Sequence, residues 1–315
     1  MSDPRAPVGS RRCARLRATR ARSLASAMLP TSLTMRALSI VLLLSALSAC
    51  AGQPTIERVV GIPAMDRSQV AQLDTSVFSA GQFVAADGTA LTYRLLSPAT
   101  IEPGRVYPLV LQLHSSGAIG QDNQAQLDAM AKGWALPENR ARYPAFVLVP
   151  QFPVRSANYD DPVVPRSAQA SPALTSAMAL VDELAARLPV DADRIYATGF
   201  SMGGSAAWLS PVLRPGRFAA IVPISGIAPA DADAQALASL PILVMHGDAD
   251  SENPIDADRR LVATLRARGN QQVRLREYVG LAHMPPGDSL PGQAWRDWLF
   301  AQRRAAVPAS VPASE

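Results

Sequence analysis

The sequence predicts an α/β fold with a mostly parallel central sheet and helices on both of its faces. Short apolar runs alternate almost strictly with helical stretches, which indicates successive βα units. The apolar runs are continuous, as expected for strands covered on both faces. The chain has 315 residues, 48% of them apolar, and α/β domains of roughly 250 residues commonly form one unit. We therefore expect a single domain with a sizeable core.

An antiparallel hairpin is expected to open this domain. Residues 82–86 and 91–96 flank Asp87-Gly88, a dipeptide typical of tight hairpin turns. Six further strands are expected at 109–113, 146–149, 195–198, 220–224, 242–245 and 273–278. Helices are expected at 123–132, 173–188, 202–213, 232–240, 256–268 and 293–303. The short connection between 220–224 and 242–245 leaves no room for a large cap domain.

The chain divides into four parts by composition. We expect residues 1–49 to be a signal region, 50–78 a lipid-anchored tether, 79–304 the folded domain, and 305–315 a disordered Ala/Pro/Ser tail. The tether is inferred from the mixed, poorly periodic sequence of residues 51–76. Met28 and Met35 are both plausible start residues.

The signal region resembles that of bacterial lipoproteins. Arg36 precedes an uncharged run of 13 residues, 37–49, too short for a bilayer span of about 20 residues. The run ends in Leu47-Ser48-Ala49-Cys50, which resembles a lipobox. We expect Cys50 to be the lipidated first residue of the mature chain. An ordinary secretion signal and a buried amino-terminal helix are the alternatives.

Charge and cysteine content argue against a basic binding surface and against an intramolecular disulfide. Residues 1–36 contribute +7 to a total of +4, which leaves −3 for the remainder and no basic surface for nucleic acid or anionic lipid. Removal of Cys13 with the signal would leave no partner for an intramolecular disulfide. Ala51-Gly52 lacks the aspartate associated with inner-membrane retention, so the resemblance implies the outer membrane, facing the periplasm.

The motif Gly199-Phe200-Ser201-Met202-Gly203 follows an expected strand and precedes an expected helix. This G-x-S-x-G context is that of a nucleophile elbow, in which a tight turn exposes the serine hydroxyl at the sheet edge. Gly199 and Gly203 permit the turn. The alternative is an ordinary small-residue turn.

A serine nucleophile requires a histidine base and a carboxylate to orient it. The chain has three histidines, and only His246 and His283 follow the serine. In the order Ser, acid, His, the base is His283, because His246 lies at a strand end where a structural role is expected. The acid is Asp250, with Asp248 as the alternative, which we expect instead to shape the turn.

Acyl transfer also requires hydrogen-bond donors for the developing oxyanion. The backbone N–H of Met202, directly after the nucleophile, is one candidate. The second is expected in the loop after strand 109–113, where Ser116 is preferred and Ser115 is next. His114 is expected to brace this loop.

Several segments resemble the α/β-hydrolase family, in the group of polyhydroxyalkanoate depolymerase-like esterases, feruloyl esterases and predicted peptidases. They lie at 107–123, 146–152, 190–204, 218–226, 246–250 and 280–283 within a similarity over roughly 80–302. The resemblance places the nucleophile, acid and base on Ser201, Asp250 and His283. The family usually has His-Gly where this chain has His114-Ser115, which concerns the geometry of the second oxyanion donor.

The expected function is that of a serine carboxylesterase acting on a small or medium ester through an acyl-enzyme on Ser201. The alternatives are a prolyl-oligopeptidase-like serine peptidase and a catalytically silent envelope lipoprotein that binds a partner. Phe152, Tyr159 and Trp208 are candidates for an acyl pocket. No cofactor or metal is expected, since neither ligand spacing nor a dinucleotide or P-loop fingerprint occurs.

Overall fold

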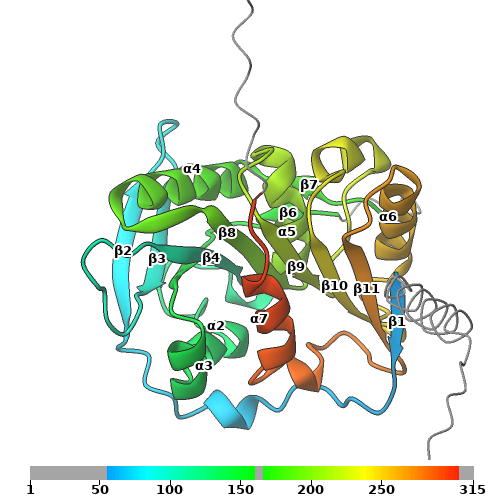
Figure 1. Cartoon of the computed structure of the whole chain (residues 1–315), viewed down its shortest axis with the longest axis horizontal. Coiled ribbons are helices and arrows are strands. Elements are labelled where there is room, and N and C mark those ends of the chain that lie inside the picture. The colour runs from blue at the N-terminus through cyan, green and yellow to red at the C-terminus, as the bar shows by residue number, and fades with distance from the viewer. Residues whose placement is uncertain (1–54, 160–165, 305–315) are drawn as a thin grey trace, which may run out of the picture. The chain divides into compact units, whose positions relative to one another are not determined.

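The computed structural model describes residues 55–159 and 166–304. The expected signal region, Cys50 and the expected tail lie outside these residues. The described chain is built around a nine-stranded sheet (Figure 1). The chain thus has the predicted α/β architecture.

The sheet is parallel except at one edge. Its order is β1-β11-β10-β9-β8-β4-β5-β3-β2, in which β3 and β2 are antiparallel to their neighbours. The strands are β1 (Ile56–Val59), β2 (Phe78–Val84), β3 (Ala90–Leu96), β4 (Tyr107–Leu113), β5 (Phe146–Gln151), β8 (Val190–Phe200), β9 (Ala220–Ile224), β10 (Ile242–Gly247) and β11 (Val273–Tyr278). A separate pair joins β6 (Ala157–Asn158) and β7 (Gln169–Ala170).

Helices cover both faces of the sheet (Figure 1). One face packs against α4 (Pro172–Arg187), α5 (Met202–Leu213) and α6 (Asp256–Ala267). The other packs against α2 (Ala129–Lys132), α3 (Pro137–Arg142) and α7 (Gln293–Phe300). Short 3-10 turns occur at η2 (Arg67–Val70), η3 (Ser116–Ala118), η4 (Gly133–Ala135), η5 (Asp231–Leu237) and η6 (Gly287–Ser289).

The predicted hairpin is confirmed, with Gly88 at φ 84° in the turn between β2 and β3. The predicted helices 123–132 and 232–240 are wrong in extent. The Asp122 carboxylate accepts the backbone N–H groups of Gln124 and Ala125, which holds a turn, and Asp128 caps a helix of only four residues. The segment around 232–240 is the 3-10 turn η5. The short helix α3 was not predicted.

The expected tether is also wrong within residues 55–78. Residues 56–59 form β1, which pairs with the edge strand β11, and Arg58 reaches Asp248 at 3.3 Å. Met65 and Val70 are buried in the core. This segment is part of the folded domain because a parallel edge and an apolar surface are available to it.

No helix among the described residues is both long enough and apolar enough to cross a bilayer.

Candidate active site

Ser201 lies in a sharp turn between β8 and α5. Its backbone has φ 58° and ψ −119°, in a region that non-glycine residues rarely adopt. The turn is fixed by the Ser201 N–H, which donates to the Ile224 carbonyl of β9 at 2.9 Å. The side chain is thereby presented at the carboxyl edge of the sheet, as the predicted nucleophile elbow requires.

Glycines around Ser201 allow three backbones to approach closely. A Cβ on Gly199 would lie 2.5 Å from the Leu113 carbonyl oxygen, and one on Gly203 would overlap the same atom. A Cβ on Gly204 would overlap the Ile224 carbonyl oxygen. The lack of a side chain at these glycines therefore allows α5 to pack directly against the ends of β4, β8 and β9.

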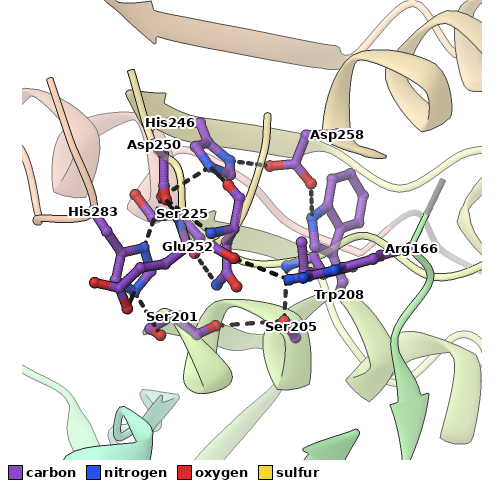
Figure 2. Close-up of polar contacts among 12 residues, drawn as sticks. Arg166, Ser201, Ser205, Trp208, Ser225, His246, Asp250, Glu252, Asp258 and His283 are labelled. Atoms are coloured by element: carbon purple, nitrogen blue, oxygen red, sulfur yellow. Dashed lines mark hydrogen bonds and ion pairs between the residues drawn. The ribbon is translucent and has the colours of Figure 1, made fainter. Parts of the chain in front are cut away.

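The three predicted catalytic side chains meet at this edge (Figure 2). Ser201 Oγ is 2.9 Å from His283 Nε2, and His283 Nδ1 is 2.7 Å from Asp250 Oδ2. Ser201 follows β8, Asp250 follows β10 and His283 follows β11, and these parallel strands end at the same edge of the sheet. The shared edge brings together Ser201 and His283, which are 82 positions apart in the sequence, and Asp250 and His283, which are 33 apart. The ring of Phe200 packs on the His283 imidazole, with centroids 5.0 Å apart.

Asp250 is held as a carboxylate. Its Oδ1 accepts the backbone N–H groups of Glu252 at 3.0 Å and Asn253 at 2.8 Å. Burial alone would raise the pKa of Asp250, but hydrogen bonds from His246, His283 and the Asn253 backbone outweigh it and hold the pKa well below its usual range. Oδ2 remains negatively charged to face His283.

Asp248, the alternative acid, faces elsewhere. Its Oδ1 accepts the Gly280 N–H at 2.6 Å and its Oδ2 contacts Arg58 at 3.3 Å. It was expected to shape its own turn, and instead it ties that turn to the loop after β11. Local backbone bonds are made by Asp250.

A second buried histidine lies behind Asp250 (Figure 2). His246 Nε2 is 3.3 Å from Asp250 Oδ2, and Nδ1 is 2.7 Å from Asp258 Oδ2. Asp258 Oδ1 accepts the Trp208 indole N–H at 2.9 Å. Burial disfavours a charged ring, but hydrogen bonds and attraction to the two carboxylates prevail and raise the pKa of His246 to about 9.

His114 braces the loop after β4, as predicted. Its Nδ1 is 2.7 Å from the Ser115 carbonyl oxygen, and its Nε2 accepts the Phe152 N–H at 3.0 Å. Burial lowers the pKa of His114, so the ring is neutral.

Both candidate oxyanion donors begin helical turns. Met202 is the first residue of α5 and Ser116 the first of η3, and such N–H groups have no intrahelical acceptor. Ser115 has φ −73° and ψ 168°, an ordinary extended conformation, so a serine in place of the family's glycine causes no backbone strain.

A pocket of about 70 Å³ adjoins the site. Its wall includes Ser115 and Phe200, which flank the elbow and the oxyanion loop, and Pro285, two residues after His283. The remaining lining residues are Met65, Arg67, Asp128, Ala129 and Met130. The aromatic residues expected to form an acyl pocket, Phe152, Tyr159 and Trp208, belong instead to the hydrophobic core.

Sequence reasoning did not anticipate the contacts of Asp258. It shares a helical face with Leu261, Val262 and Leu265, all buried, and this spacing was the available signal for a buried carboxylate. No comparable signal marks Met65 or Arg67. Within residues 55–159 and 166–304, no group of three or more His, Cys, Asp or Glu could hold a metal ion.

The chain is similar to known proteins in sequence and in fold. Residues 152–292 match the family described as Phospholipase/Carboxylesterase. The crystal structure of a thermostable esterase superposes with a TM-score of 0.64 at 32% identity, covering 72% of this chain and 64% of the other. The chain has the α/β-hydrolase fold.

Two further matches carry the same fold or similar sequence. The protein NocK of Nocardia uniformis subsp. tsuyamanensis, which bears the name of an esterase, is 28% identical over 64% of this chain and 56% of its own length. The thermophilic esterase Est2 of Thermogutta terrifontis has a TM-score of 0.52 at 17% identity, covering 74% of this chain and 95% of that one. This α/β-hydrolase chain spans under two thirds of NocK and of the thermostable esterase.

Proposed function

We propose that this protein is a serine carboxylesterase. The observation that carries the proposal is the continuous chain Ser201 Oγ, His283, Asp250, with distances of 2.9 and 2.7 Å between successive side chains. A strained serine on a strand-to-helix turn, a histidine within hydrogen-bond reach and an ionised aspartate behind it provide the parts of nucleophilic acyl transfer.

Each group has a defined role in the reaction, and His283 acts first as base and then as acid. His283 Nε2 takes the Ser201 proton as Oγ attacks the ester carbonyl, and the resulting imidazolium is stabilised by Asp250. The backbone N–H groups of Met202 and Ser116 are the candidate donors to the oxyanion. His283 then protonates the leaving alcohol, and water attacks the acyl-enzyme by the same steps in reverse.

The pocket of about 70 Å³ favours an ester with a short acyl group. Methionine side chains, a proline and Phe200 give one part of its wall an apolar surface that suits a short aliphatic chain, and Arg67, Ser115 and Asp128 make the rest polar. Hydrolysis of p-nitrophenyl esters of increasing acyl length tests this. We expect kcat/KM to be highest at two to four carbons, and a maximum at long chains contradicts the assignment.

Labelling with a fluorophosphonate tests the nucleophile directly. We expect the protein to form a covalent adduct on Ser201 and Ser201→Ala to remain unlabelled, since the adduct needs an activated hydroxyl. Unlabelled wild-type protein would instead favour a silent binding protein. Matched ester and amide substrates then separate an esterase from a serine peptidase, and we expect hydrolysis of the ester alone.

We further propose that the enzyme is a lipoprotein of the bacterial envelope, attached through Cys50. The support is the apolar run at 37–49, which ends in Leu47-Ser48-Ala49 and is followed directly by Cys50. We expect the full chain to partition into the outer-membrane fraction of a bacterial host and Cys50→Ser to be lost from it. Unchanged partitioning of Cys50→Ser would exclude lipid attachment at this residue.

A further inference from the structure

His246 is a buried histidine that the acyl-transfer mechanism does not use. It is fully buried at the end of β10, and the contacts of both ring nitrogens are defined. Nε2 faces the Asn253 carbonyl oxygen at 2.8 Å and Asp250 Oδ2 at 3.3 Å. Nδ1 faces Asp258 Oδ2 at 2.7 Å.

All of these partners are acceptors. A backbone carbonyl can only accept, so Nε2 must carry a proton. The two aspartates are acceptors as carboxylates, and Asp258 Oδ1 also accepts the Trp208 indole N–H. A neutral ring would turn a lone pair on Nδ1 toward a carboxylate. The hydrogen-bond inventory is satisfied when both nitrogens donate.

The other carboxylates near His246 are either paired with arginine or largely exposed. Glu277 is its register partner on β11, and its carboxylate contacts Arg259 of α6 at 2.8 Å and Arg58 of β1 at 3.6 Å. Asp248 on the following loop binds Arg58, and Glu252 is largely exposed. The charge of the His246 ring is therefore balanced mainly by Asp250 and Asp258.

We propose that His246 is a positioning residue, an imidazolium held between Asp250 and Asp258, that fixes the Asp250 carboxylate against His283. It contacts both ends of the acid loop, through Asp250 Oδ2 and the Asn253 carbonyl. Asn253 in turn donates from Nδ2 to the Ser225 carbonyl at 2.9 Å, which joins this loop to the end of β9. The polar chain thus runs from Ser201 to Trp208 in the core.

This inference rests on the proposed function, but its first test does not need turnover. The chain has three histidines, so a spectrum of ¹⁵N-histidine-labelled protein can be assigned by single substitutions. We expect both ring nitrogens of His246 to be protonated from about pH 5 to pH 8, well beyond the range of an ordinary histidine. A single ring proton on His246 at about pH 7 would overturn the proposal.

His114 is the internal control of this measurement. It is equally buried, but its Nε2 accepts the Phe152 N–H, so we expect one ring proton, on Nδ1, throughout the same range. The two buried rings should therefore give opposite protonation states in one spectrum. Two neutral rings would show that burial alone determines the state of His246.

A double-mutant cycle tests the positioning role. We expect His246→Gln to lower kcat by about 10 to 100-fold with KM little changed, because a misplaced catalytic group slows the chemical step. In Asp250→Asn the same substitution should cost little more, since its effect passes through Asp250. Additive losses, or unchanged kcat in His246→Gln, would overturn the role.

A remote substitution separates positioning from loss of stability. Asn139→Ala removes a buried amide that donates to the Gly133 and Pro291 carbonyls, away from the acid loop. We expect kcat of Asn139→Ala to be unchanged below its unfolding temperature. Fluorophosphonate labelling of wild-type protein reports on the proposed function by itself, so its failure is distinguishable from failure of the His246 proposal.

Discussion

At the scale of single residues, the site depends on matched donors and acceptors along one line of side chains. Ser201, His283 and Asp250 were predicted from motif and chain order, since a strand–Gly-x-Ser-x-Gly–helix pattern and three histidines leave few choices. The support behind them was not predicted. His246 and Asp258 are held by contacts between β10 and α6, and no local pattern specifies which buried polar groups meet across two elements.

Removal of the base should abolish turnover without unfolding the protein. We expect His283→Ala to lower kcat by several orders of magnitude, because Ser201 loses its proton acceptor. Circular dichroism should be unchanged, since the His283 side chain lies at the edge of the domain and remains partly accessible. Turnover near that of the wild type would refute the assignment.

Asp250→Asn tests the orientation of the same ring. The amide would present its NH₂ group or a weaker acceptor to His283 Nδ1, which favours the wrong tautomer, and we expect kcat to fall by about four orders of magnitude. Asp248→Asn is the matched control on the same loop, and we expect it to retain turnover within about tenfold of the wild type. Equal losses in the two variants would return Asp248 to consideration as the acid.

The positive charge on His246 makes the free energy of unfolding fall as the pH becomes alkaline. Its pKa is raised from 6.5 to about 9 on folding, so its contribution is complete below about pH 6.5 and is lost as the pH rises through 9. We expect the urea midpoint of the wild type to fall between pH 6.5 and 9.5. His246→Gln should show a smaller fall over this range, and an identical fall in both proteins would contradict this origin.

At the scale of elements, the parallel strands carry the site because their carboxyl ends share one edge. Apolar runs predicted the positions of β4, β5, β8, β9, β10 and β11, although β8 begins at Val190, five residues before its predicted start. Helices were less predictable where side chains compete for backbone groups, as Asp122 does before α2. The extent of α5 was predicted to the residue. The glycines of the nucleophile elbow mark its start, and a run of buried residues continues along the helix.

The close approach of α5 to β4 is sensitive to a single methyl group. In Gly203→Ala the added Cβ would overlap the Leu113 carbonyl oxygen, and we expect a loss of about 1–3 kcal/mol or more in unfolding free energy. Gly117→Ala is the control, because its Cβ would be 3.9 Å from Ser115 Oγ. Chemical denaturation of both variants measures the difference, and equal stabilities would contradict tight packing at the elbow.

At the scale of the whole molecule, the sequence predicted one domain and its sheet but misplaced the amino-terminal boundary. Residues 55–78 have no regular apolar periodicity, so the sequence predicted a tether there. Their place depends on long-range pairing of β1 with β11 and on backbone bonds from Met65 to Pro285 and from Gly287 to Pro63. Such long-range contacts cannot be predicted from the local amino-acid composition.

This boundary can be tested by shortening the chain. A protein that begins at residue 79 would lose β1 and the buried side chains of Met65 and Val70. Full burial of one such side chain contributes about 1.5–3 kcal/mol to the free energy of unfolding. We expect a lower unfolding temperature than for a protein that begins at residue 54, as measured by calorimetry. Equal unfolding temperatures would show that residues 55–78 are dispensable to the fold.

The segment just before η2 also has a consequence for control of the enzyme. It grips the turn that delivers the catalytic base, since Met65 N–H donates to Pro285 at 2.8 Å and Pro63 accepts from Gly287 at 2.7 Å. Cleavage just after Met65 would weaken both hydrogen bonds and loosen the turn that carries His283, while the Ser201 turn is held separately by the Ile224 carbonyl. Proteolysis in this segment is therefore expected to lower the rate of ester hydrolysis at temperatures at which the domain is still folded.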